Sequence, residues 1–398
     1  MANVLVVGAA ESCLGMIHTV KDMGHKAIII ASDATQPGYK FADHAILCKD
    51  NDLDNAIKEI SSYKIDAIVP TPVDRPLVWQ AQIAEKLRLP FISVETALNF
   101  RFKHRMKRLL YDHGVPTARW KRFESGMFTI DDLTSFSYPL IVKPVDGYAS
   151  RGVVLVNKDE ELLRQVSEAI DYSSDGSFLV EEFVDGMEYN AEGICFDGNV
   201  EIYAIVEKIR DPFPRTIEMG HVIPPNISVE DEQLILSTVV DAVHAMGMKV
   251  GAFNAEIKVL NGRAKIIEVN GRLAGDFIVS HLIEPTTGQD MQKELVKACL
   301  GQTPEKAKRA YQRHGIIRFY NLPVGRRIIS LDFASIRAKF SDDLVWVKSF
   351  FEDNTKIPEV LHMGHRSGFF IILADNRREL DDRVEYILDA ITSCIQLA

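Results

Sequence analysis

The 398-residue sequence predicts an α/β protein of two to four domains, and three observations lead to this prediction. Short apolar segments alternate with helical segments from residue 3 to residue 95, as in a parallel sheet built from βαβ units. A glycine-containing hairpin is expected over residues 138–156, and a second hairpin over residues 251–270. Weaker strands after about residue 305 precede a last amphipathic helix, RRELDDRVEYILDAITSCI.

The first part of the chain alternates regularly between the two kinds of secondary structure. We expect, in chain order, a strand at 3–8, a helix around 14–23, a strand at 25–32, a helix around 52–61, a strand at 65–71, a helix around 74–88 and a strand at 89–93.

The middle of the chain has clear helix boundaries. A basic helix is expected over residues 99–113, closed by Gly114 and Pro116, and a second helix over 158–171 with Asn157 as its N-cap. Further on we expect strands from 177 to 209 with a turn at Asp197-Gly198, and a helix over about 229–246.

Composition and charge exclude several classes of protein. The net charge of −10 argues against nucleic acid as a partner. The five cysteines show no CxxC or CxxH spacing, so neither a disulfide framework nor a zinc site is expected. No apolar run approaches the ~20 residues of a membrane span. The N-terminal MANVLVVG lacks a basic leader, so we expect a cytoplasmic protein without a signal peptide.

The N-terminal turn GAAESCLG, residues 8–15, leaves three interpretations open. It could bind a dinucleotide, with Asp33 holding a ribose hydroxyl, but only Gly8 fits the GxGxxG pattern. It could be a tight strand-to-helix turn without a ligand. It could instead contact a substrate other than a nucleotide, because helix N-termini attract carboxylates as well as phosphates.

The segment 251–272, GAFNAEIKVLNGRAKIIEVNGR, is expected to form a hairpin of two strands. In each strand, the apolar side chains fall on the odd-numbered residues and so share one face. If the two apolar faces lie on the same side of the hairpin, the residue numbers of any two directly opposed residues must therefore add up to an even number. A loop of three residues, 260–262, satisfies this condition and pairs position 256 with 266 and 254 with 268. We therefore predict such a loop, with Gly262 at positive φ.

This register brings Glu256, Glu268 and Asn270 together on one face of the hairpin. Carboxylate and amide oxygens are ligands suited to Mg²⁺, whereas two adjacent carboxylates without a cation would repel. The alternative is a solvated polar sheet face. Arg272, on the glycine-containing turn that follows, could stabilise a phosphoryl group or an anionic intermediate.

The hairpin IVKPVDGYASRGVVLV resembles a phosphate-binding loop in composition only, because it leads from strand to strand. Lys143 ends its first strand, and Gly147, Ser150 and Gly152 lie in the loop. We interpret it as a lid whose backbone N–H groups cover a triphosphate, and we expect it to be poorly ordered without nucleotide.

Residues 177–190, SFLVEEFVDGMEYN, form a strand that enters a turn. Glu181 and Glu188 could accept hydrogen bonds from ribose hydroxyls, and the backbone near Phe183 and Val184 could contact an adenine edge. The alternative is a pair of solvent-exposed acidic residues in a turn.

These motifs, in this order across residues 99–276, resemble the ATP-grasp superfamily and specifically its carboxylate–amine ligases. The resemblance implies an N-terminal Rossmann-like domain at 1–95, a central two-subdomain ATP-grasp region at 96–305 with its glycine-rich lid near 138–185, and a small α+β C-terminal domain at 306–398. It implies ATP and Mg²⁺, or Mn²⁺, as cofactors. By resemblance, Lys103 and Lys143 contact the ATP phosphates, Glu181 and Val184 contact the adenine, and Glu188 contacts the ribose. The resemblance also implies that Glu256, Glu268 and Asn270 bind the metal. It implies that Arg272 contacts the acyl phosphate or tetrahedral intermediate.

The segment 207–227 is similar to that of bacilysin-type L-amino-acid ligases in its phrase GHVIPP. The resemblance places Lys208, Glu218 and His221 toward small-molecule carboxylate and amine substrates, although His221 could also be a packed loop histidine. The implied activity is an ATP-dependent amino-acid or dipeptide ligase, for which a homodimer is a common assembly. Alternatives are a purine-pathway ligase of the same fold, a nicotinamide-dependent oxidoreductase, and a catalytically silent nucleotide-binding module.

Overall fold

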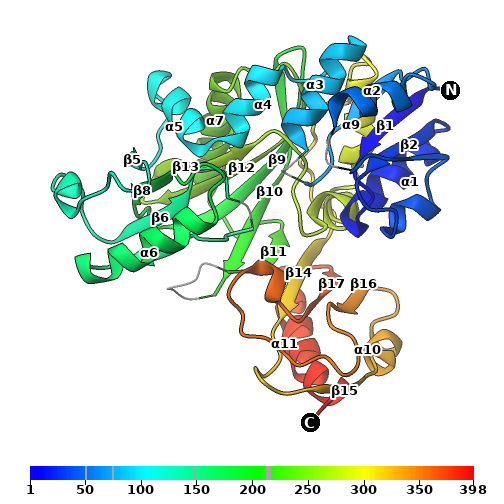
Figure 1. Ribbon diagram of the computed structural model, residues 1–398. Helices are drawn as coiled ribbons and strands as arrows, with labels where there is room; N and C mark the ends of the chain where they lie inside the picture. The colour runs from blue at the N-terminus through cyan, green and yellow to red at the C-terminus, as the bar shows by residue number, and fades with distance from the viewer. Residues whose placement is uncertain (50–51, 74–75, 148, 212–216) are drawn as a thin grey trace.

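The computed structural model describes residues 1–49, 52–73, 76–147, 149–211 and 217–398. Four sheets organise the described part of the chain (Figure 1). The N-terminal sheet and a smaller antiparallel sheet lie at opposite sides of the view, with the central strands of an eight-stranded sheet between them and the C-terminal helices and strands below.

The N-terminal sheet is parallel and has the strand order β3-β2-β1-β4, as βαβ connections require. Its strands β1, β2 and β4 are buried and rich in Val, Ile and Ala because helices cover both faces, whereas the edge strand β3 is mostly exposed. The elements are β1 (Asn3–Val7), the 3₁₀ helix η1 (Glu11–Cys13), α1 (Leu14–Asp22), β2 (Lys26–Ala31), β3 (His44–Leu47), α2 (Leu53–Ile60), β4 (Ala67–Val69) and α3 (Leu77–Leu87).

Three details of the predicted elements are wrong. Residues 89–93 form no strand; Ser93 caps the next helix instead, and Pro90 has no N–H to give to a sheet. The predicted helix 99–113 is two helices, α4 (Val94–Arg101) and α5 (Lys103–Asp112), because Phe102 adopts an extended conformation. The N-cap of α6 (Asp159–Asp171) is Lys158, one residue after the predicted Asn157.

The smaller antiparallel sheet has the order β5-β8-β6-β7 and contains the predicted glycine hairpin. Helix α6 packs on it and buries an apolar cluster between them. Its strands are β5 (Trp120–Phe123), β6 (Leu140–Pro144), β7 (Val154–Val156) and β8 (Phe178–Glu182). Tyr148, in the predicted lid loop, lies outside the described residues.

The eight-stranded sheet has the order β13-β12-β9-β10-β11-β14-β17-β16, so the C-terminal strands continue the central ones. Its members are β9 (Met187–Phe196), β10 (Asn199–Arg210), β11 (Glu218–Ile223), β12 (Val250–Leu260), β13 (Arg263–Asn270), β14 (His314–Tyr320), β16 (Leu344–Ser349) and β17 (Gly368–Ala374). The remaining elements are α7 (Val229–Ala245), the π-helix η5 (Ile278–Ile283), α8 (Glu284–Thr287), α9 (Met291–Cys299), β15 (Ile328–Leu331), α10 (Ala334–Lys339), α11 (Arg377–Cys394) and β18 (Ile395–Leu397).

The β12–β13 hairpin closes with two residues and not with the predicted three. Asn261 and Gly262 both have positive φ, as a type I′ turn requires, so the expectation for Gly262 is confirmed while the loop length is wrong. The parity condition is met by a bulge at Ile267, which shifts the register so that Glu256 opposes Glu268. The bulge, and not the length of the loop, therefore brings Glu256 and Glu268 together.

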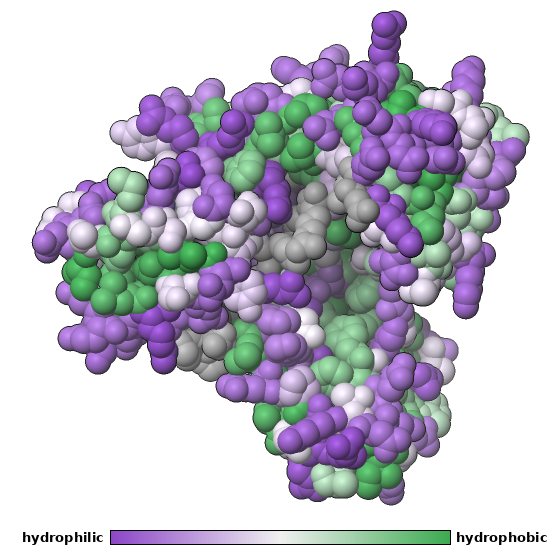
Figure 2. All heavy atoms as spheres, viewed as in Figure 1, coloured by the Kyte–Doolittle hydropathy of each residue, from purple (hydrophilic) through white to green (hydrophobic). Residues whose placement is uncertain are grey.

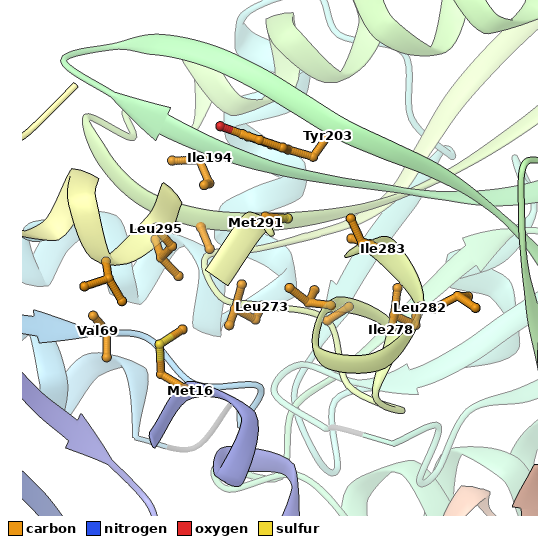
Figure 3. Close-up of a cluster of buried hydrophobic side chains, with 14 of the residues drawn as sticks. Met16, Val69, Ile194, Tyr203, Leu273, Ile278, Leu282, Ile283, Met291 and Leu295 are labelled. Atoms are coloured by element: carbon orange, nitrogen blue, oxygen red, sulfur yellow. The ribbon is translucent and has the colours of Figure 1, made fainter. Parts of the chain in front are cut away.

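One hydrophobic core joins the N-terminal sheet to the eight-stranded sheet (Figure 3). Met16 of α1 and Val69 of β4 point toward Leu273 and Met291, and beyond these residues lie Ile194 and Tyr203 of β9 and β10. This core crosses the predicted domain limits near residues 95 and 305. The chain between β13 and α9 is thereby held against the N-terminal part.

None of the helices in the described part of the chain is long and apolar enough to span a membrane.

Candidate functional site

A cleft of about 480 Å³ lies where the N-terminal part, the smaller sheet and the eight-stranded sheet meet. Figure 2 shows the molecule hollowed on the face where these three parts approach one another. The cleft brings together side chains from segments far apart in sequence, from Ser12 of the N-terminal turn to Met363.

Fourteen of the sixteen predicted site residues line this cleft. The two that do not are Gly152, which packs beside Pro144 and Tyr172, and Lys208, whose side chain is fully buried behind the cleft wall. Those that do are Lys103, Lys143, Gly147, Ser150, Glu181, Phe183, Val184, Glu188, Glu218, His221, Glu256, Glu268, Asn270 and Arg272.

Lys103 begins α5 and reaches under the glycine hairpin. Its backbone N–H donates to the carbonyl of Val145, and its Nζ donates to the carbonyl of Gly147 at 2.8 Å and lies 3.1 Å from Glu268 Oε1. A side chain on Gly147 would overlap Pro144, so only glycine fits this approach. Lys103 therefore connects the hairpin loop to the β13 carboxylate.

Glu181 of β8 is held between two lysines. Lys143 Nζ lies 2.8 Å from one carboxylate oxygen, and Lys107 Nζ lies 3.1 Å from the other while also donating to Thr117. Burial lowers the pKa of Lys107 to about 8, and although burial alone would raise the pKa of Glu181, the two lysines hold it below its ordinary value.

Lys107 was not among the predicted site residues. It lies one helical turn after Lys103 in KHRMKR, so the i, i+4 spacing of two lysines on one helix face was a signal that could have identified it.

Phe183 and Val184 follow β8 and are held by Lys258 of β12. Lys258 Nζ donates to the Val184 carbonyl at 2.9 Å and lies 4.6 Å from the centre of the Phe183 ring. Glu188 lies near the same ammonium group, at 3.9 Å. The end of β8 is thus fixed against β12 at the edge of the cleft.

Lys208 of β10 is a buried hub for three carboxylates. Its Nζ lies 2.6 Å from Glu218, 3.0 Å from Glu188 and 3.2 Å from Glu256. Although burial alone would raise the pKa of Glu218, Lys208 and Arg210 lower it to about 2. From behind the cleft wall, Lys208 therefore holds the pKa values of Glu188 and Glu218 below their ordinary value.

Glu256, Glu268 and Asn270 line the cleft from β12 and β13, with Glu256 directly opposed to Glu268. Burial raises the pKa of Glu256; Glu218, Glu188 and Glu268 raise it further, and Lys208 opposes them. Closely spaced carboxylates with an amide are the donor set that Mg²⁺ prefers, so the residues present fit a divalent cation.

His221, Asp276 and Arg366 form a network at the other end of the cleft. His221 Nε2 lies 3.2 Å from Asp276 Oδ2, and Arg366 holds both oxygens of Asp276 at 2.8 and 2.9 Å. Arg366 also donates to the Glu218 carbonyl and stacks on Phe319 at 3.5 Å. Neither Asp276 nor Arg366 was predicted, although Asp276 ends the GRLAGD turn.

Glu192 of β9 is a fully buried carboxyl group behind the cleft. Asn254 donates to its Oε1 at 2.5 Å, and burial raises its pKa to about 8 from an ordinary 4.5. It lines no part of the cleft, but Asn254 does.

This pKa predicts a pH-dependent effect of Glu192→Gln on stability. Between about pH 4.5 and about pH 8 the folded protein keeps a proton that the unfolded chain has released, so the contribution of Glu192 to stability falls as the pH rises. The free energy of unfolding of Glu192→Gln should therefore improve relative to the wild type by more than about 1 kcal/mol between about pH 5 and about pH 8. Urea denaturation of both proteins at each pH measures this difference, and a constant difference would contradict the raised pKa.

Comparison with known proteins agrees with this geometry. Residues 136–280 match the ATP-grasp domain family. The alanine–anticapsin ligase of Bacillus subtilis is 26% identical over 285 residues, which cover 64% of this chain and 58% of that ligase. The match therefore spans little more than half of the relative's length.

Two solved structures share the whole fold. The L-amino acid ligase of Bacillus licheniformis superimposes with a TM-score of 0.82 at 22% identity, covering 100% of this chain and 98% of that one. The phosphoribosylglycinamide synthetase of Anaerococcus prevotii gives a TM-score of 0.77 at 21% identity, covering 100% and 99%. The chain therefore contains an ATP-grasp domain over residues 136–280, and over its full length it shares the fold of these two solved structures.

Proposed function

We propose that this protein is an ATP-dependent ligase that activates a carboxylate as an acyl phosphate and joins it to an amine, forming a dipeptide or an amino-acid amide. The observation that supports this proposal best is the convergence of Lys103, Lys143, Glu256, Glu268 and Arg272 on one cleft. The similarity to two amino-acid ligases, one in sequence and one in structure, favours amino acids as substrates.

Each part of the cleft has a proposed role. Lys103 and Lys143 hold phosphates, and Gly147 and Ser150 belong to a lid over them. Glu181, Phe183, Val184 and Glu188 hold the adenosine; Glu256, Glu268 and Asn270 hold Mg²⁺ or Mn²⁺; Glu218 and His221 face the substrates, with Lys208 supporting Glu218 from behind.

The chemistry requires charge neutralisation and exclusion of water. A carboxylate oxygen of the substrate attacks the γ-phosphorus and ADP leaves; the amine nitrogen then attacks the acyl carbon and phosphate leaves, with one proton released. Glu256, Glu268 and Asn270 would hold a divalent cation, which would supply neutralisation of the charge on the phosphate oxygens. Lys103 and Lys143 orient the phosphates, and Arg272 stabilises the oxyanion of the tetrahedral intermediate.

A screen of phosphate release tests this proposal. The protein is incubated with ATP, Mg²⁺ and pairs of amino acids, and products are identified by mass spectrometry. We expect phosphate release that requires both a carboxylate and an amine, and a product whose mass equals the sum of the two substrates minus water.

The same screen, together with a nucleotide-binding measurement, distinguishes the alternatives. Turnover only with purine-pathway carboxylate substrates would favour the second candidate, which the full-length similarity to phosphoribosylglycinamide synthetase supports. Binding of NAD without ATP would instead favour an oxidoreductase that uses the N-terminal turn.

A further inference from the structure

Three polar side chains form a row behind the proposed metal site. Glu192 of β9 is the direct cross-strand neighbour of Asn254 of β12, which is in turn the direct neighbour of Asn270 of β13. Their exposed fractions are 0%, 2% and 6%. Groups this buried are costly unless they are hydrogen-bonded, so their mutual contacts determine how each is oriented.

The hydrogen bonds in this row all run in one direction. Asn254 donates its Nδ2 to Glu192 Oε1 at 2.5 Å, which leaves its Oδ1 facing Asn270. Asn270 donates its Nδ2 to Asn254 Oδ1 at 3.4 Å, which leaves its own Oδ1 for the cleft. A side-chain amide has one donor end and one acceptor end, so fixing one end fixes the other.

Glu192 sets the direction of the row. An ionised carboxylate can only accept a hydrogen bond, and a protonated one keeps a carbonyl oxygen that accepts, as Oε1 of Glu192 does here from Asn254 Nδ2. An amide at this position could turn either end toward Asn254. The acceptor oxygen that Glu192 turns toward Asn254 therefore sets the direction of both asparagine amides.

We propose that Glu192 and Asn254 are positioning residues that force the amide oxygen of Asn270, and not its nitrogen, to face the metal. The inference rests on the proposed function, because it assumes that a divalent cation binds at Glu256, Glu268 and Asn270. Magnesium and manganese take oxygen ligands, so a reversed Asn270 amide would place N–H groups against the cation.

Two matched double variants separate this role from simple packing. Glu192→Leu with Asn254→Leu fills the space with apolar groups, strands no buried carboxyl group and removes the hydrogen bonds. Glu192→Gln with Asn254→Asp exchanges the two functional groups and conserves charge; the introduced glutamine is then the donor, and the introduced aspartate still accepts from Asn270. The second pair therefore keeps the orientation of Asn270, whereas the first pair loses it.

The measurement is binding of Mn²⁺ to protein saturated with a non-hydrolysable ATP analogue, followed by the electron paramagnetic resonance signal of free Mn²⁺. We expect the apolar pair to weaken Mn²⁺ binding about 10- to 100-fold, as loss of an outer-shell partner does. We expect the exchanged pair to stay within about threefold of the wild type. A packing role predicts the reverse order, because leucine fills a buried site better than a carboxylate does.

The outcomes separate the positioning role of Glu192 and Asn254 from the proposed metal site itself. Wild-type affinity in the apolar pair, or a loss confined to the exchanged pair in its folded form, overturns the positioning role alone. Failure of the wild type to bind Mn²⁺ with nucleotide overturns the proposed metal site and the positioning role with it. If the apolar pair does not fold, Asn254→Ala removes the same amide without adding volume, and the same weakening is expected.

Discussion

Glu268→Gln is expected to reduce ATP-dependent phosphate release at least about 100-fold while leaving the fold intact. The substitution preserves shape and removes one negative charge from the proposed metal site. Glu268 also lies 3.1 Å from Lys103, which would lose its charged partner but keep its hydrogen bond to the Gly147 carbonyl. Since both charge neutralisation and the position of a phosphate-binding lysine depend on this carboxylate, the loss should appear mainly in kcat.

Phosphate release is measured at several Mg²⁺ concentrations, with the melting temperature as the test of folding. Glu95→Gln is the matched control, because Glu95 is an exposed glutamate on α4 that pairs only with the exposed Arg105 in the described structure. Near-normal turnover of Glu268→Gln at ordinary Mg²⁺ would remove Glu268 from the metal site.

The order of the motifs along the chain made most of the cleft predictable. IVKP, EEFVDGME, GAFNAE and EVNGR each end or begin a strand, and all four contribute side chains to one cleft. Alternation along a strand assigns each polar residue to a face, and this local rule needs no knowledge of the rest of the molecule. The N-terminal βαβ segments were predictable for the same reason.

The register of the β12–β13 hairpin shows where local rules have two solutions. The alternation of apolar residues requires that the residue numbers of opposed residues add up to an even number. Either a three-residue loop or a bulge satisfies this condition. The sequence NG strongly favours a two-residue type I′ turn, so the bulge at Ile267 was the consistent choice. The prediction failed because the two-residue turn was rejected on parity without a bulge to restore it.

The network around Asp276 could not have been read from any single segment. Arg366 lies 90 residues from Asp276 in sequence and contacts it because β17 extends the sheet that contains β11. No pattern in the sequence links a single arginine before one strand to a single aspartate after a distant glycine. Contacts of this kind depend on the order of strands within the sheet, which periodicity does not encode.

Lys143→Ala is expected to lower kcat/KM for ATP about 100-fold or more, because it removes a buried ammonium group from the proposed phosphate site. The structure also offers a competing explanation, since Lys143 Nζ lies 2.8 Å from Glu181 and could act only by positioning that carboxylate.

Lys107→Met distinguishes these two explanations, because Lys107 contacts the other oxygen of Glu181 but does not line the cleft. If Lys143 acts on phosphate, its loss should exceed that of Lys107→Met by about 10-fold or more, measured as phosphate release against ATP concentration. Equal losses would assign Lys143 to positioning, whereas unchanged ATP affinity and turnover in Lys143→Ala would remove it from the site. A direct contact of Lys143 with phosphate should therefore appear as a larger loss of kcat/KM in Lys143→Ala than in Lys107→Met, since both lysines bind Glu181.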